Sequence, residues 1–189
     1  ILSSALNQSK YDLLIENYFD KISKKDGITS LNTAFSSEGS FIHIPKNVQV
    51  DKPIQVIYFS TGKNESVFYQ PRNLIIVGEN SQVEIIERHQ SLSENSVLVN
   101  SVSEIYCNVR SVVKHYKIQN DKTNASLIDN TFVSQERNSD YSLHTFSLGG
   151  ELTRNNLSII QNGERIESTI NGITIIGSNQ HVDLSLIHI

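Results

Sequence analysis

The sequence predicts a mainly β protein in which short strands wind into a β-helix after a short helical N-terminal region. Three observations lead to this fold class. Apolar residues recur with a helical period between residues 11 and 22, the period changes to two after Gly39, and one turn-containing segment occurs twice, at 74–84 and 173–183. A change from period 3.6 to period 2 marks a change from helix to strand.

The helical pattern comes first in the chain. One stripe of a 3.6-residue period is formed by Tyr11, Leu14, Ile15, Tyr18, Phe19 and Ile22. Lys24, Lys25 and Gly27 follow it, a basic last turn and a residue type that commonly ends helices. A second short helix is expected over about 30–35. We therefore expect a helical region over 1–38, with its true start upstream of Ile1.

After Gly39, short β-rich runs alternate with turns rich in Asn, Gly, Ser and Asp, and no convincing helical pattern follows. A sandwich, a barrel and a coil of stacked strands all fit this pattern. The segment LIIVGENSQVE at 74–84 aligns without gaps on ITIIGSNQHVD at 173–183, and IIQNGERIES at 159–168 is a weaker relative. Repetition of one supersecondary unit favours the coil.

The turn residues agree with winding. In GENS and GSNQ, glycine stands where a strand must bend, and the asparagine tolerates a left-handed backbone. We therefore interpret LIIVGENSQVEIIE as a corner between two strands of one coil. Asn162-Gly163 and Asn171-Gly172 are typical of hairpins, so the sandwich stays an alternative on pattern alone.

Both chain ends suggest a fragment. The β-helix is expected over 39–183, unfinished at its end. The last six residues, LSLIHI at 184–189, match one reading frame of a transposon adapter and are expected to be non-native. Because an unfinished β-helix leaves unpaired strand edges, the fragment is expected to self-associate or to be only marginally stable.

Composition excludes several classes of protein. A net charge of −4 without a basic cluster argues against nucleic acid binding. No apolar run reaches the roughly 18 residues of a membrane-spanning helix. A single cysteine, Cys107, permits no internal disulfide and fits a reducing compartment, so we expect a cytoplasmic protein.

No metal or catalytic site is predicted. The histidines stand far apart at 43, 89, 115, 144, 181 and 188, without the close native pair of a zinc site, and are expected to be surface or hydrogen-bonded residues. Cys107 lies in a β-rich run and is expected to be a small buried thiol packed between coils. The motifs of serine hydrolases, P-loop ATPases and dinucleotide-binding proteins are absent from the sequence.

Polar clusters are expected to be structural. Arg154-Asn155-Asn156 is interpreted as an Asn-rich turn whose amides stack along the coil axis; the alternative is an element facing a partner or the lumen. Arg72, Glu84 and Glu87 are expected on turns and solvent-exposed faces. We therefore predict no catalytic, cofactor-binding or metal-binding residue in this chain.

Three long segments, at 18–60, 70–89 and 144–183, together resemble the SufB/SufD family, the scaffold proteins of the SUF iron–sulfur cluster assembly system. They include YFDKISKKDGITSLNTAFSSEGSFIHIPKNVQV, QPRNLIIVGENSQVEIIERH and SLGGELTRNNLSIIQNGERIES. The last segment and the NQHVD that follows it are more similar to SufD than to SufB.

This resemblance implies a right-handed parallel β-helix preceded by a helical region. It also implies a non-catalytic scaffold that pairs with a SufB-like subunit and a SufC-like ATPase, with the iron–sulfur cluster handled by the complex and no cofactor bound by this fragment. A homodimer is left open.

A β-helical polysaccharide-acting enzyme or carbohydrate-binding module is the competing class. It would need a groove with clustered charges and exposed aromatic residues. Seven Tyr, seven Phe and no Trp give that class little support.

Overall fold

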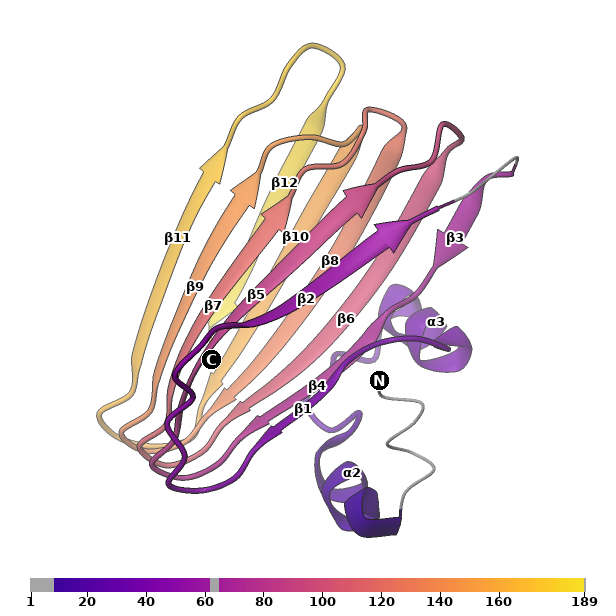
Figure 1. Ribbon diagram of the computed structural model, residues 1–189. Coiled ribbons are helices and arrows are strands. Elements are labelled where there is room, and N and C mark those ends of the chain that lie inside the picture. Colours follow the sequence, from indigo (N-terminus) through magenta and orange to yellow (C-terminus); the bar gives the residue numbers. More distant parts are fainter. Residues whose placement is uncertain (1–8, 62–64, 189) are drawn as a thin grey trace.

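A computed structural model describes residues 9–61 and 65–188 and shows two β-sheets that the chain builds alternately (Figure 1). Sheet A contains β1 (Phe41–Ile44), β3 (Val67–Tyr69), β4 (Arg72–Val77), β6 (Val97–Cys107), β8 (Ala125–Gln135), β10 (Leu152–Gln161) and β12 (His181–His188). Sheet B contains β2 (Ile54–Ser60), β5 (Gln82–Ser91), β7 (Val112–Gln119), β9 (Asp140–Ser147) and β11 (Glu167–Thr174).

The strand order shows that the chain winds. Sheet A runs β1-β4-β6-β8-β10-β12, with β3 also paired to β6, and sheet B runs β11-β9-β7-β5-β2. All of these pairs are parallel. Because each strand pairs with the strand one coil later in the same sheet, the fold is a parallel β-helix, which confirms the predicted fold class.

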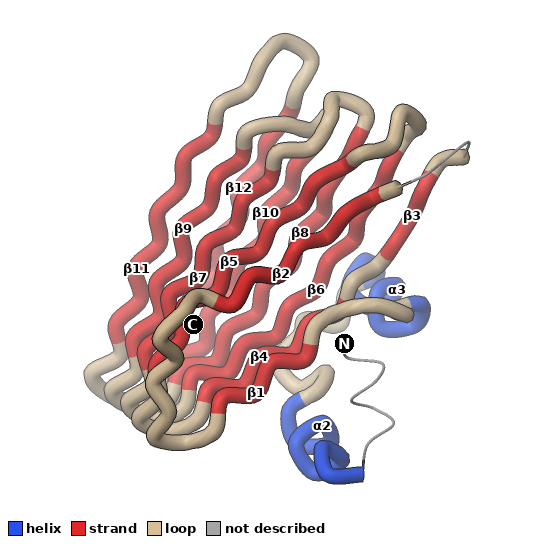
Figure 2. Tube along the Cα trace, viewed as in Figure 1, coloured by secondary structure: helices blue, strands red, loops and turns tan. Residues whose placement is uncertain are grey.

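The corners that lead from sheet A to sheet B stack on one another, and Figure 2 shows them at the lower left as tan loops. Each contains one residue with positive φ, namely Asn47, Asn80, Arg110, Asn138 and Arg165. Backbone hydrogen bonds join successive corners, from Asn80 N–H to Val109 O and from Arg110 N–H to Arg137 O. Asparagine tolerates this left-handed conformation better than most residues, so the corners at Asn47, Asn80 and Asn138 follow a local preference that Arg110 and Arg165 do not share.

The two similar segments occupy opposite corners. The turn at 78–81 leads from β4 in sheet A to β5 in sheet B, whereas the turn at 175–180 leads from β11 in sheet B to β12 in sheet A. The weaker relative at 159–168 is the structural counterpart, because it crosses from β10 in sheet A to β11 in sheet B. Asn171-Gly172 lies inside β11 and forms no hairpin. Winding was therefore correctly predicted, but from an alignment that joins non-equivalent corners.

The helical region is shorter and divided differently than the apolar stripe predicts. After a 3-10 turn, Ser9–Tyr11, helix α2 spans Asp12–Tyr18 and helix α3 spans Gly27–Phe35. Gly27 is thus the first residue of α3 rather than the end of the preceding helix. Asp26 caps α3, since its side chain accepts a hydrogen bond from the Thr29 N–H. None of the helices in the described residues is long and apolar enough to cross a membrane.

The N-terminal region covers the outer face of sheet A at its start (Figure 1). Leu74 and Ile76 of β4 and Tyr106 of β6 form a buried cluster there, and Tyr18 and Phe19 pack against it. Asn32 of α3 is fully buried and donates to the carbonyl oxygens of Pro71 and Asn100. The first strands are therefore covered on both faces, which explains why every residue of β4 is buried.

Two apolar clusters lie between the sheets. The larger lies beside the stacked corners and includes Val77, Val83, Ile105, Val133 and Ile159. The smaller lies toward the opposite corners and is formed by Val97, Val99, Ala125 and Leu127. The stretch of interior between them is polar, and it defines the candidate site.

The segment 184–188 continues β12, and its residues pair in parallel register with β10 from Asn155↔Leu184 to Ile159↔His188. Leu184 and Leu186 are 58% and 56% exposed. The non-native origin of 184–189 stays a prediction that sequencing of the genomic locus checks.

Replacing Gly39 by Ala is expected to destabilise the fold by about 2–4 kcal/mol. Gly39 has φ +147°, and a Cβ there would lie 1.7 Å from the carbonyl oxygen of Arg72. Gly27→Ala is the matched control because nothing lies within 4 Å of the added Cβ, and a change below about 1 kcal/mol is expected there. Chemical denaturation of both variants checks this. Equal stability of the two would show that the backbone at Gly39 can move.

Candidate functional site

Six polar and charged side chains cross the interior between the two apolar clusters, and we call them the polar belt. They are Glu87, His89, His115, Lys117, Asp129 and Thr131, each at most 7% exposed. Strand alternation places them inside. In β5, Val83, Ile85, Glu87 and His89 are separated by two residues each and share the face that packs into the core.

Lys117 is the centre of the belt. Its ammonium group lies 2.6 Å from Asp129 Oδ2 and 3.2 Å from Glu87 Oε2, and it donates to Thr131 Oγ1 at 2.6 Å. Glu87 and Lys117 are register partners in sheet B, whereas Asp129 and Thr131 belong to β8 of sheet A. The ammonium group therefore joins the two sheets across the interior.

His115 extends this network toward the larger apolar cluster. Its Nε2 lies 3.1 Å from Glu87 Oε2, and its Nδ1 lies 3.0 Å from the hydroxyl oxygen of Tyr141. His115 and Tyr141 are both fully buried. The network therefore runs without a break from Lys117 through Glu87 and His115 to Tyr141. Its ionisable groups are buried away from bulk water.

The pKa values of the belt follow from burial opposed by charge. Burial alone would raise the pKa of Glu87, but the charge of Lys117 and the nearby His115 outweigh it and hold that pKa well below its usual range. Burial would lower the pKa of Lys117, but Asp129 and Glu87 outweigh it and raise that pKa. The belt is therefore a buried ammonium group held between two carboxylates.

Stability is expected to fall as the pH drops below about 6.5, the usual pKa of an unfolded histidine. Burial lowers the pKa of His89, although the charges of Asp129 and Glu87 partly oppose this, whereas Lys117 adds to it. The unfolded chain therefore binds a proton that the folded chain does not, and the limiting slope is about 1.4 kcal/mol per pH unit.

Denaturation midpoints at pH 7.5 and pH 5.5 check the expected slope. His89→Gln is expected to flatten the dependence, whereas His181→Gln, at an exposed position, is expected to leave it unchanged. An identical slope in His89→Gln and the wild type would contradict the assignment to His89.

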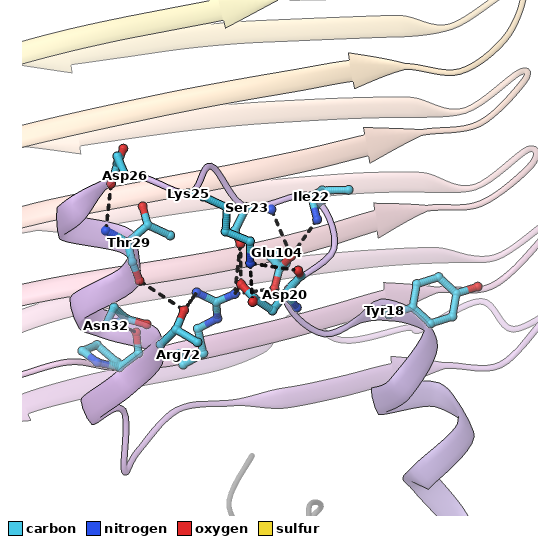
Figure 3. A network of polar contacts seen from close by, with 12 residues as sticks. Tyr18, Asp20, Ile22, Ser23, Lys25, Asp26, Thr29, Asn32, Arg72 and Glu104 are labelled. Atoms are coloured by element: carbon cyan, nitrogen blue, oxygen red, sulfur yellow. Dashed lines mark hydrogen bonds and ion pairs between the residues drawn. The ribbon is translucent and has the colours of Figure 1, made fainter.

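A second buried charge cluster, which we call the N-terminal anchor, lies on the outer face of sheet A (Figure 3). Arg72 Nη2 donates to Glu104 Oε2 at 2.6 Å, and both side chains are fully buried. The Glu104 carboxylate also accepts the N–H groups of Asp20 at 2.7 Å, Ile22 at 3.0 Å and Ser23 at 3.2 Å. One carboxylate from β6 thus holds the segment that follows α2.

The anchor explains where the first helix ends. Asp20 adopts φ +59°, so the chain leaves the helix and turns its N–H groups toward Glu104. The Asp20 carboxylate lies 3.2 Å from Arg72 and also pairs with Lys25. Partial burial raises the pKa of Asp20, but hydrogen bonds from Lys25 and Ser23 and the charge of Arg72 outweigh it, so the net shift is downward.

Two of the residues expected on exposed faces are buried. Arg72 is the largest fully buried side chain, and Glu87 is 1% exposed, so both expectations were wrong. Glu84 is half-buried. For Glu87 the sequence did hold a signal: it alternates in step with Val83 and Ile85, which predicts that its side chain faces the interior. The sequence holds no local signal for Arg72, because its partner Glu104 lies one coil away in sheet A.

Cys107 is buried between the sheets, as predicted, and burial raises the pKa of its thiol. Of the histidines, His89 and His115 lie in the belt, His144 stacks on Tyr116 on the outer face of sheet B, and His181 is exposed. His43 is half-buried, and the side chain of His188 lies outside the described residues. Over residues 9–61 and 65–188, no group of three or more His, Cys, Asp and Glu side chains could hold a metal ion.

The turn expected at Arg154-Asn155-Asn156 is wrong, because all three residues lie inside strand β10. The stacking of amides and the position facing the interior each apply to one residue. Asn156 donates from Nδ2 to Asn130 Oδ1 at 2.8 Å, and these two residues are register partners, so their amides stack along the coil axis. Asn155 faces the interior and lines a pocket of about 220 Å³ together with Lys117 and Asp129. Arg154 is exposed and lies 3.5 Å from Asp183.

Comparison with known proteins places the chain in a family. Residues 58–188 match the SUF system FeS cluster assembly SufBD core domain, and residues 2–56 match the SufBD protein N-terminal region. An iron-sulfur cluster assembly SufBD family protein of Synechocystis sp. is 30% identical over 180 residues, which cover 89% of this chain and 39% of that protein.

Two further relatives agree. The chloroplastic protein ABCI7 of Arabidopsis thaliana is 28% identical over 90% of this chain and 37% of its own length. The iron-sulfur cluster assembly protein SufB of Bacillus subtilis is 30% identical over 95% of this chain and 38% of its own length. The chain thus spans less than two fifths of these curated relatives. With the core domain matched over most of the β-helix, the chain belongs to the SufBD family.

Proposed function

We propose that the protein containing this chain is a scaffold subunit of an iron–sulfur cluster assembly complex. The observation that carries this proposal is the match of the SufBD core domain to residues 58–188, which include all but the first strands of the parallel β-helix. A rigid stack of parallel strands suits a scaffold because its coils hold one another in register over a long surface. The scaffold itself is non-catalytic.

The proposal extends to the partners and the compartment. The resemblance of the segment at 144–183 to SufD supports a SufD-like protein, which pairs with a SufB-like subunit and a SufC-like ATPase. The cluster is assembled by the complex, in the cytoplasm, and this part of the chain binds no cofactor. The division into a helical region over 1–38 and a β-helix over 39–183 is part of the same proposal.

Deletion of the gene tests the assembly role. We expect a SufB-like partner purified from the deletion strain to contain less iron and acid-labile sulfide, and the intact gene to restore both. Unchanged cluster loading would contradict the proposal. Polysaccharide cleavage by the purified protein would instead support the competing β-helical enzyme.

A further inference from the structure

His89 is buried in the interior with no hydrogen-bond partner on either ring nitrogen among the described residues. Its ring stacks on Tyr58, with the ring centroids 4.7 Å apart and the planes inclined by 16°. The stacking fixes the ring but satisfies neither nitrogen. Buried polar groups in folded proteins are nearly always hydrogen-bonded, either to protein or to ordered water.

Two neighbouring side chains also have an unpaired oxygen. Gln119, the register partner of His89 on β7, is 5% exposed and has no partner for Oε1 within the described part of the chain. Asp129, on the opposite sheet, is 4% exposed; its Oδ2 contacts Lys117, while its Oδ1 has no partner there. One imidazole and two acceptor oxygens in the same region thus lack hydrogen-bond partners among the described residues.

These three residues line a common cavity, together with Ser147 and Asn155 among others. The space in it is about 10 Å³, which is close to the volume needed for a single water molecule. The cavity lies between the coils of β5, β7 and β9 on one side and β8 and β10 on the other.

The charges around the cavity select its ligand. The ammonium group of Lys117, which lines the cavity, would repel a cation. The carboxylates of Asp129 and Glu87, both next to Lys117, would repel an anion. An apolar molecule would leave all three groups unpaired. The ligand must therefore be neutral and very small, and it must both donate and accept hydrogen bonds.

We propose that this cavity binds one ordered water molecule that joins the two sheets of the β-helix. The water donates to Asp129 Oδ1 on sheet A and to Gln119 Oε1 on sheet B, and it accepts the N–H of a neutral His89. Three hydrogen bonds are typical of a buried water in proteins. The site thus completes the polar belt at the position that Lys117 does not reach.

A crystal structure of the protein containing this chain, at a resolution that shows ordered water, tests the proposal. We expect a water molecule within hydrogen-bond distance of one ring nitrogen of His89 and of Asp129 Oδ1. A direct hydrogen bond between the imidazole and that carboxylate, with no water between them, would overturn the proposal. So would density that only an ion explains.

A pair of variants separates this water from ordinary hydration. His89→Leu is expected to lose the water molecule, whereas His144→Leu, on the outer face of sheet B, is expected to keep it. Retention of the water in His89→Leu at the same position would show that His89 does not hold it. The wild-type structure decides the proposal even where a variant does not fold.

Discussion

Lys117→Met is expected to destabilise the protein by about 3–5 kcal/mol, because it leaves two buried carboxylates without a cation. Lys117 lies 3.2 Å from Glu87 and 2.6 Å from Asp129, and all three side chains are at most 8% exposed. A loss of this size is a large fraction of the 5–15 kcal/mol by which domains are usually stable. Chemical denaturation followed by circular dichroism measures it.

Lys114→Met is the matched control for this prediction. Lys114 lies on the same strand but on its exposed face, so a change within about 0.5 kcal/mol is expected. Replacing Glu87 by Gln and Asp129 by Asn in the Lys117→Met background is expected to recover part of the loss, since no unpaired charge then remains. Equal effects of Lys117→Met and Lys114→Met would refute the role assigned to the belt.

Arg72→Met is expected to release the N-terminal region from sheet A and to cost about 3–5 kcal/mol. The variant leaves the buried Glu104 carboxylate with backbone N–H partners but no cation. Hydrogen exchange should therefore increase first at residues 12–36, before the strands of sheet B are affected. Mass-spectrometric hydrogen exchange, combined with denaturation, checks both parts.

Arg110→Met provides the comparison at the surface. Arg110 pairs with Glu79 at 2.6 Å, but both side chains are at least half exposed, so a loss below about 1 kcal/mol is expected. If Arg72→Met left exchange over 12–36 unchanged, the anchor would not be what holds this region.

Local sequence patterns predicted the strands and corners but not the buried charges. The stretch LIIVGENSQVEIIE was correctly interpreted as a corner, because Asn80 adopts a left-handed backbone there and a Cβ at Gly78 would lie 2.6 Å from the Lys46 nitrogen of the preceding corner. Arg72 and Glu87 were placed at the surface, where charged residues usually lie. Their partners Glu104 and Lys117 stand about 30 residues away along the chain and meet them only through the winding of the coil.

The end of the first helix illustrates the same limit. The apolar stripe continues past Tyr18 to Ile22, yet α2 ends at Tyr18 because Glu104, from a strand more than 80 residues later, accepts the N–H groups that follow. Helical periodicity describes which face is apolar, whereas tertiary hydrogen bonds decide where the helix stops. Strand parity was a local signal for the polar belt that could have been used, since Glu87 shares the parity of Val83 and Ile85. His115 and Lys117 likewise share the parity of Val113.

Co-purification tests the central claim most directly. The protein containing this chain, carrying an affinity tag and expressed from its own locus, should bring down a SufB-like subunit and a SufC-like ATPase in fixed stoichiometry. Native mass spectrometry of the eluted complex measures that stoichiometry. Recovery of the tagged protein alone, under conditions in which the other two subunits purify together, would contradict its role as a scaffold subunit.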